Sequence, residues 1–168
     1  MKEIVKKLMD KNEYTEPFEM SLQMILDGQI STRLLNERLL DAFSKNISDI
    51  KSEAIRFILD FAEMYLCDNV ITDEELKNMR MLKLFFRIED NELLVDGNDV
   101  RIKKMLSKQF EMMYFDNKID SKEAEYKVRL QELFNLSYDQ FLSFEKDAVK
   151  SALEKGAKIS ELDTYYKI

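Results

Sequence analysis

Two short acidic segments contain the side chains of this chain that are best suited to coordination chemistry. We call residues 68–75 and 116–123 the acidic corners. The first contains four carboxylates and the second three, and the candidate ligands are Asp68, Asp73 and Glu75 in the first, and Asp116, Asp120 and Glu123 in the second. Calcium and magnesium prefer carboxylate and other oxygen ligands. If the carboxylates of either corner converge, we expect a weak site for one of these divalent cations, and no other cofactor is indicated.

The acidic corners are copies within an internal repeat. Aligning residues 63–93 with 111–141, an offset of 48, gives eight identical pairs in thirty-one positions without a gap. The pairs are Glu63/Glu111, Met64/Met112, Asp68/Asp116, Asn69/Asn117, Ile71/Ile119, Glu75/Glu123, Leu82/Leu130 and Phe86/Phe134. A period of this size is typical of a duplicated supersecondary unit. Each copy is predicted to be a helix, a tight turn and a second helix.

Helix capping accounts for the same residues without a ligand. The carboxylate of Asp68 can accept a hydrogen bond from the backbone two residues on, and Asn69 tolerates the left-handed backbone that reverses a chain. Thr72 is a good N-cap, with Glu75 at the spacing of a capping box, and Ile71 is expected to anchor the turn in the core. The second corner repeats the pattern with Asp116, Asn117, Ile119, Asp120 and Glu123. Capping is the commoner cause of such a pattern, and metal binding is the alternative.

The spacing of the corners excludes a calcium-binding EF-hand loop. A loop that starts at Asp116 has Lys127 where the final bidentate Glu belongs, and one that starts at Asp68 has Met79 there. Any cation bound at the corners would need a different and weaker arrangement of ligands.

The order of residues in the corners resembles the TerB-like tellurite-resistance family, in which an acidic residue, Gly or Asn, a variable residue, Ile, a cap and Glu occur twice between helices. The matching residues are Asp68, Asn69, Ile71, Thr72 and Glu75, then Asp116, Asn117, Ile119, Asp120 and Glu123. The resemblance covers residues 48–156. It implies a compact helical bundle of two pseudo-symmetric halves, acidic residues that bind a divalent metal, and a role in bacterial stress or phage defence. The family usually has Gly after the first Asp, whereas both corners here have Asn, which preserves the turn and weakens the inference of a backbone-lined metal site.

The composition excludes several classes of enzyme. The chain has no histidine, so triads that use imidazole and zinc sites that use histidine cannot form. Its three glycines, at 28, 97 and 156, cannot make a dinucleotide or P-loop phosphate motif. A metal-dependent hydrolase built on carboxylates alone is the least favoured alternative, and we expect a protein that is not an enzyme.

The net charge constrains the partner. With 33 acidic and 26 basic residues the net charge is −7, which disfavours nucleic acid and anionic membranes and favours a neutral or basic protein partner. No run approaches the ~20 apolar residues of a membrane span, and no apolar segment of a signal peptide follows Met1–Lys7, so we expect a cytoplasmic location. Cys67 is the single cysteine and lies in an apolar run, where a buried thiol is expected.

The spacing of apolar residues predicts helices throughout the chain. Their ranges are 2–11, 16–28, 31–46, 48–66, 72–86, 99–115, 120–134 and 137–156. Thr15 and Ser31 are predicted N-caps, and Leu40 and Val128 are placed on buried stripes. Residues 89–98 fit a short helix better than a hairpin. The ten Met and eleven Phe are expected to fill the core, with a Met-rich groove for a partner helix as the alternative.

These observations predict an all-α fold, a single bundle of about seven to nine helices with an internal helix-turn-helix duplication. Residues 1–47 are predicted to be N-terminal helices packed on a duplicated bundle of residues 48–168. The expected function is that of a TerB-like stress or defence accessory module that binds a protein partner, with weak metal binding at the corners. The alternative is an acidic immunity or antitoxin-type inhibitor that covers a basic toxin.

Overall fold

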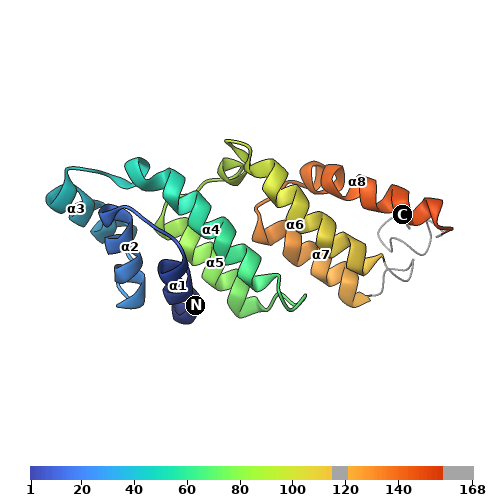
Figure 1. Cartoon of the computed structure of the whole chain (residues 1–168), viewed down its shortest axis with the longest axis horizontal. Coiled ribbons are helices and arrows are strands. Elements are labelled where there is room, and N and C mark those ends of the chain that lie inside the picture. Colours follow the sequence, from blue (N-terminus) through green and yellow to red (C-terminus); the bar gives the residue numbers. More distant parts are fainter. Residues whose placement is uncertain (115–120, 157–168) are drawn as a thin grey trace. The chain divides into compact units, whose positions relative to one another are not determined.

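The computed structural model describes residues 1–114 and 121–156, and its regular structure within these ranges is entirely helical (Figure 1). The α-helices are α1 (Lys2–Lys11), α2 (Glu16–Leu26), α3 (Thr32–Phe43), α4 (Lys51–Tyr65), α5 (Asp73–Phe85), α6 (Asn98–Met113), α7 (Ser121–Leu133) and α8 (Tyr138–Glu154). Two 3₁₀ turns, η1 (Ile47–Ile50) and η2 (Glu92–Leu94), precede α4 and α6. The all-α prediction is confirmed for the described residues. The hairpin alternative for residues 89–98 is wrong, since η2 occupies that segment.

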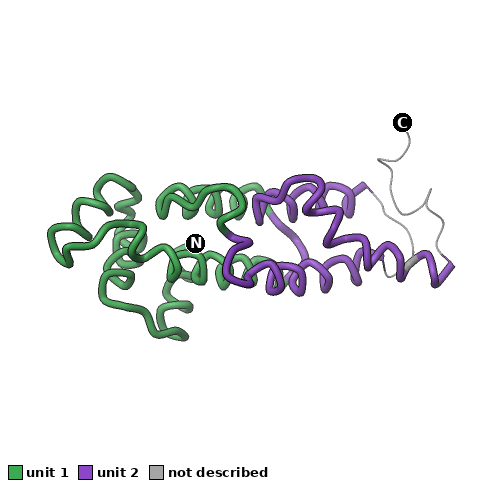
Figure 2. Tube along the Cα trace, turned by 90° about the horizontal axis from the view of Figure 1, so that it is seen from above, with its two compact units in different colours: residues 1–67, 72–92 green, residues 68–71, 93–168 purple. Residues whose placement is uncertain are grey.

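The chain divides into two compact units, which Figure 2 colours separately. Unit 1 contains residues 1–67 and 72–92, and unit 2 contains residues 68–71 and the described residues from Leu93 onward. Within unit 1, α1 packs against α2 and α4, α2 against α3, and both α3 and α4 against α5. The N-terminal helices therefore belong to the same unit as α4 and α5, so the compact units do not coincide with the predicted boundary between residues 47 and 48.

A cluster of aromatic rings forms the centre of unit 1. Phe18 of α2 stacks on Phe86, which follows α5, with ring centroids 5.3 Å apart. Phe57 of α4 meets both rings edge-on, at 5.9 and 6.4 Å. All three side chains are fully buried. Such pairs add about 0.5–1.5 kcal/mol each beyond their buried area, so the cluster joins three segments that are distant in the sequence.

The loop between α1 and α2 is held by α4 rather than by its own cap. Thr15 makes no side-chain hydrogen bond to α2. Its backbone N–H and its hydroxyl instead donate to the carboxylate of Glu53, at 2.9 and 2.6 Å. Arg56 donates to the carbonyl of Glu13 at 2.9 Å and lies 5.1 Å from the ring centre of Tyr14. Thr15 is the N-cap residue of α2, as predicted, but its side chain makes no capping hydrogen bond because its hydroxyl donates to Glu53, 38 residues away in the sequence.

The predicted repeat is present in the backbone. At the offset of 48 residues, α5 maps onto α7 at both ends, and the last residue of α4 maps onto the last residue of α6. Both second helices end alike: Arg87 and Asn135 have positive φ values of 51° and 53°. The next N–H in each copy then reaches back to a carbonyl inside the helix, from Ile88 at 2.8 Å and from Leu136 at 3.0 Å. These are the hydrogen bonds of a Schellman end, so the two copies share local geometry as well as sequence.

Four burial predictions are wrong, among them that of Met112, which is 39% exposed although the methionines are expected to fill the core. Leu40 on α3 and Val128 on α7 are exposed, and so is the Cys67 thiol. On α7 the buried stripe passes through Ala124, Lys127 and Leu130, which leaves Val128 on the outer side. An apolar side chain is not obliged to be buried, and the inward side of α7 carries Lys127, which forms an ion pair with Glu145.

None of the helices in the described part of the chain combines the length and the apolar character needed to cross a bilayer.

Candidate binding site

The first acidic corner is held by helix caps. The Oδ1 atom of Asp68 accepts a hydrogen bond from the N–H of Val70 at 3.1 Å, and Asn69 has a left-handed φ of 61°. Thr72 and Glu75 form a capping box: the N–H of Thr72 donates to Glu75 Oε2 at 2.8 Å, and the N–H of Glu75 donates to Thr72 Oγ1 at 3.2 Å. The capping prediction is confirmed for this corner.

Two buried side chains attach the first corner to apolar surroundings. Ile71 is buried, as predicted for a residue that anchors the turn. Tyr65, the last residue of α4, accepts a hydrogen bond from Asn78 of α5 at 3.2 Å. Burial, together with the negative charges of Glu75 and Glu74, raises the pKa of Tyr65 to about 12, although the hydrogen bond from Asn78 lowers it. The phenol therefore remains neutral at physiological pH and acts as a structural contact between α4 and α5.

The corners do not supply a set of metal ligands within the described ranges. Among the residues that the structure describes, no three or more His, Cys, Asp or Glu side chains form a group that could hold a metal ion. Asp68, Asp73 and Glu75 are all described and are not brought together in this way, since the carboxylate of Glu75 is used in the capping box. In the second corner Asp116 and Asp120 lie outside the described residues, and Glu123 lies in the first turn of α7. A cation site that uses the second corner stays a prediction.

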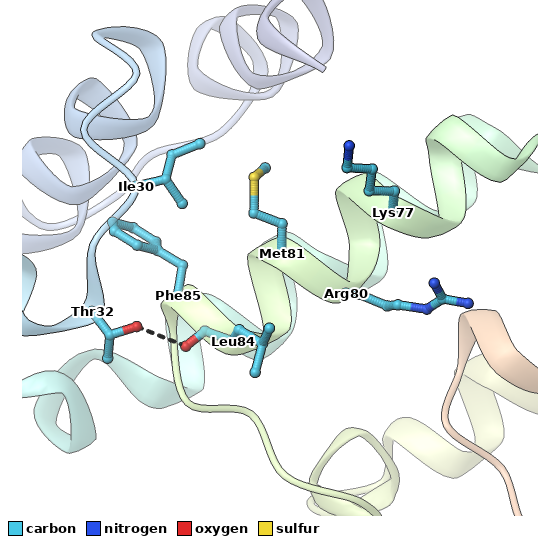
Figure 3. A pocket seen from close by; sticks show the side chains of 7 residues that line it. All are labelled: Ile30, Thr32, Lys77, Arg80, Met81, Leu84 and Phe85. Atoms are coloured by element: carbon cyan, nitrogen blue, oxygen red, sulfur yellow. Dashed lines mark hydrogen bonds between the residues drawn. The ribbon is translucent and has the colours of Figure 1, made fainter.

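A hollow on α5 has the character of a binding site instead (Figure 3). Its volume is about 320 Å³, and it lies entirely within unit 1. Its lining comes from the segment before α3, from α3 and from α5: Ile30, Thr32, Lys77, Arg80, Met81, Leu84 and Phe85. Ligand pockets range from about 300 to 1,000 Å³, so this hollow is large enough for one or two side chains of a partner.

The helical period of α5 places the lining residues beside its buried stripe. Leu76, Met79 and Leu82 pack into the core, whereas Met81 and Leu84 come from the neighbouring positions. Met81 extends toward Ile30 in Figure 3. Leu84 is 73% exposed, the largest exposed fraction among the large apolar side chains of the described residues. An exposed apolar side chain beside a hollow is a feature of interaction surfaces.

A hydrogen bond fixes one edge of the hollow. The hydroxyl of Thr32 donates to the carbonyl of Leu84 at 3.0 Å, drawn as the dashed line in Figure 3. The last four carbonyls of a helix have no partner within the helix, so this contact both satisfies the end of α5 and holds α3 beside it. The edge of the hollow is therefore formed before any partner arrives.

The charge of the hollow is opposite to that of the chain. Lys77 and Arg80 contribute two cations, and none of the seven lining residues is acidic. The net charge of the whole chain is −7. In the described part of the chain, the Lys77 ammonium makes no ion pair or hydrogen bond, and Figure 3 shows it extended from α5. The lining offers apolar contact and positive charge, and none of its seven residues is acidic or carries an imidazole.

Unit 2 contains a buried polar cluster that is closed to ligands. Lys127 of α7 forms an ion pair with Glu145 of α8 at 2.7 Å, and the side chains are only 10% and 3% exposed. The hydroxyl of Tyr114 donates to the same carboxylate oxygen. In the first copy of the repeat the position of Lys127 is occupied by Met79, which is also buried. The cluster therefore replaces an apolar contact and has a structural role.

Sequence reasoning did not predict the hollow. No motif in the sequence singles out Leu84, and only the alternative of a Met-rich groove points toward Met81. Four other methionines, Met24, Met79, Met105 and Met113, are buried as core residues. The pattern in the sequence that indicates the hollow is the pairing of a cation with an apolar residue four positions later in residues 77–84. This pattern alone does not show that Ile30 and Thr32 lie beside that face of the helix.

In comparisons with known proteins, no family model, no curated protein and no solved structure matches the chain.

Proposed function

We propose that this protein is a non-enzymatic accessory module, similar in kind to the TerB-like stress and defence proteins, that acts by binding a protein partner. The observation that carries the proposal is the hollow on α5, where Leu84 is 73% exposed beside a preformed apolar lining. The lining includes Met81, and methionine adapts its shape to different partners. The absence of histidine and of a phosphate-binding glycine loop from the sequence supports a binding role over catalysis.

The experiment that tests the proposal is site-specific photo-crosslinking. A photoreactive amino acid replaces Leu84 in one variant and Val100 of α6 in the control, because Val100 is 68% exposed and lies in unit 2. Crosslinking is carried out in the cell that produces the protein, and proteins captured only from position 84 are identified and purified. Each is then titrated against the full chain by calorimetry.

We expect a purified partner that binds the full chain, binds the Leu84→Asp variant about tenfold more weakly or worse, and binds the Val100→Asp variant normally. A loss of this size matches truncation of a central contact, which costs more than about 1 kcal/mol. Capture alone does not support the proposal. Equal binding of both variants by every purified candidate would refute it.

A further inference from the structure

The arrangement of charge around the hollow repeats along α5. Lys77 lies one helical turn before Met81, and Arg80 lies one turn before Leu84. Residues four apart on a helix are neighbours on its surface. Each apolar side chain of α5 at the hollow is therefore preceded by a cation on the same side, and the four residues cover about 10 Å of the helix.

We infer that the hollow takes an amphipathic acidic segment of the partner protein, with an apolar side chain against Met81 and Leu84 and a carboxylate toward Lys77. This inference rests on the proposed function and specifies the chemistry of the partner. The net charge of −7 favours a basic partner elsewhere on the surface, but complementarity at an interface is decided by the groups that face the ligand. At the hollow the lining contains no acidic residue, and the ammonium of Lys77 is available to a carboxylate.

The charges next to the hollow limit where the carboxylate binds. Asp73 and Glu74, in the first turn of α5, lie four and three residues before Lys77. They repel an acidic ligand that extends further toward the start of the helix. The segment is therefore expected to place its acidic residue at the level of Lys77 and its apolar residue nearer to the end of α5.

A protein segment fits these observations better than a membrane or a nucleic acid. Binding to anionic lipid or to a phosphate backbone depends on clusters of several Lys and Arg residues, whereas the lining has two. The net negative charge of the chain also repels both kinds of polyanion. A short peptide needs only a local match of charge and one or two apolar side chains that enter a hollow of about 320 Å³.

The test uses a randomised twelve-residue peptide library displayed on phage, selected against the full chain. The binding variant is Lys77→Glu, and the matched control is Lys104→Glu, which makes the same change of charge at an exposed lysine of α6. Enriched peptides are synthesised, and their affinities for the three proteins are measured by fluorescence anisotropy at low and high salt. Vesicles of phosphatidylglycerol are tested in parallel.

We expect the enriched peptides to carry Leu, Met or Phe with Asp or Glu three or four residues away. Their affinity should fall about fivefold or more in Lys77→Glu and stay unchanged in Lys104→Glu, because Lys77 faces the ligand and Lys104 does not. High salt should weaken binding to the native chain.

Three results would overturn the inference: no enrichment, enriched peptides without acidic residues, or vesicles that displace the peptides. Peptides that lack acids but depend on Leu84 would remove the acidic partner and leave the proposed function in place. Failure of every crosslinked partner to depend on Leu84 would instead remove the proposed function itself.

Discussion

Replacing Lys127 with methionine, the residue at the equivalent position of the first repeat, is expected to destabilise unit 2 strongly. The substitution leaves the carboxylate of Glu145 buried without its cation, which sits 2.7 Å away in the native chain. The side chains of the pair are 10% and 3% exposed, so solvent cannot replace the lost charge. Breaking one partner of a buried pair costs about 3–5 kcal/mol. A domain is stable by only about 5–15 kcal/mol, so this is a large share of the total.

Replacing all three residues of the cluster should recover most of the free energy of unfolding that Lys127→Met loses. In the triple variant Tyr114→Phe/Lys127→Met/Glu145→Met no buried charge remains at this position, and the phenol that donated to Glu145 is gone as well. Apolar replacements of a buried ion pair are often neutral or stabilising. We expect the triple variant to lie within about 1–2 kcal/mol of the native chain, which corresponds to a coupling energy of about 2 kcal/mol or more between the substitutions.

The assay is urea unfolding followed by circular dichroism, with the free energy obtained by linear extrapolation. Two compact units can unfold in separate steps, so hydrogen exchange of the amides of α7 and α8 reports on unit 2 separately. The control is Lys103→Met, which removes the ion pair of Lys103 with Asp147 between α6 and α8. Those side chains are 47% and 74% exposed, and the expected change is within about 0.5 kcal/mol.

The reasoning would be refuted if Lys127→Met changed stability no more than Lys103→Met, or if the triple variant were as unstable as Lys127→Met alone. Either result would mean that the buried pair contributes no more than an exposed one.

Three further outcomes are expected. Thr72→Ala removes the capping box of α5 and should lower the free energy of unfolding by about 1 kcal/mol in the same urea assay. The hydrogen bond from Lys51 holds the pKa of Glu92 below its ordinary value of 4.5. Because a carboxylate with a lowered folded-state pKa stabilises the folded chain while it is ionised, Glu92→Gln should be less stable than the native chain at neutral pH. In a pH series of melting curves, this difference in stability should vanish as the pH falls below 4.5. If a cation binds at the second corner, millimolar calcium or magnesium should raise the melting temperature of the native chain. Asp120→Ala should remove that rise, and Asp68→Ala should not. An unchanged melting temperature of the native chain would contradict the metal site.

Local chemistry explains which features of the fold could be predicted. Asn69 reverses the chain and Thr72 caps α5 because the interacting groups lie within three residues of each other. Their geometry is almost complete once the helix forms, whatever the rest of the chain does. The same holds for Ser137 and Gln140 at the start of α8, whose capping box has hydrogen bonds of 2.8 and 3.3 Å.

The candidate site was beyond prediction because it is made by non-local contacts. The hollow needs Ile30 and Thr32 beside Leu84, and the hydrogen bond between Thr32 and Leu84 joins residues 52 positions apart. Nothing in residues 77–84 alone distinguishes a lined hollow from an ordinary solvated face of a helix. The sequence shows that Met81 and Leu84 each follow a cation by four residues, but it does not show which residues of the fold lie across from them.

The sequence by itself determined that the chain is helical, that one helical pair occurs twice, and that the first corner is closed by caps, because helical periodicity and capping act over a few residues. Only the tertiary structure decided that Lys127 is buried with Glu145, that the Thr15 hydroxyl binds Glu53 rather than its own helix, and that α5 carries a cationic apolar hollow. The physical reason is that the environment of a side chain, and with it the cost of burying a charge or exposing a leucine, is set by neighbours that the chain brings together from far apart.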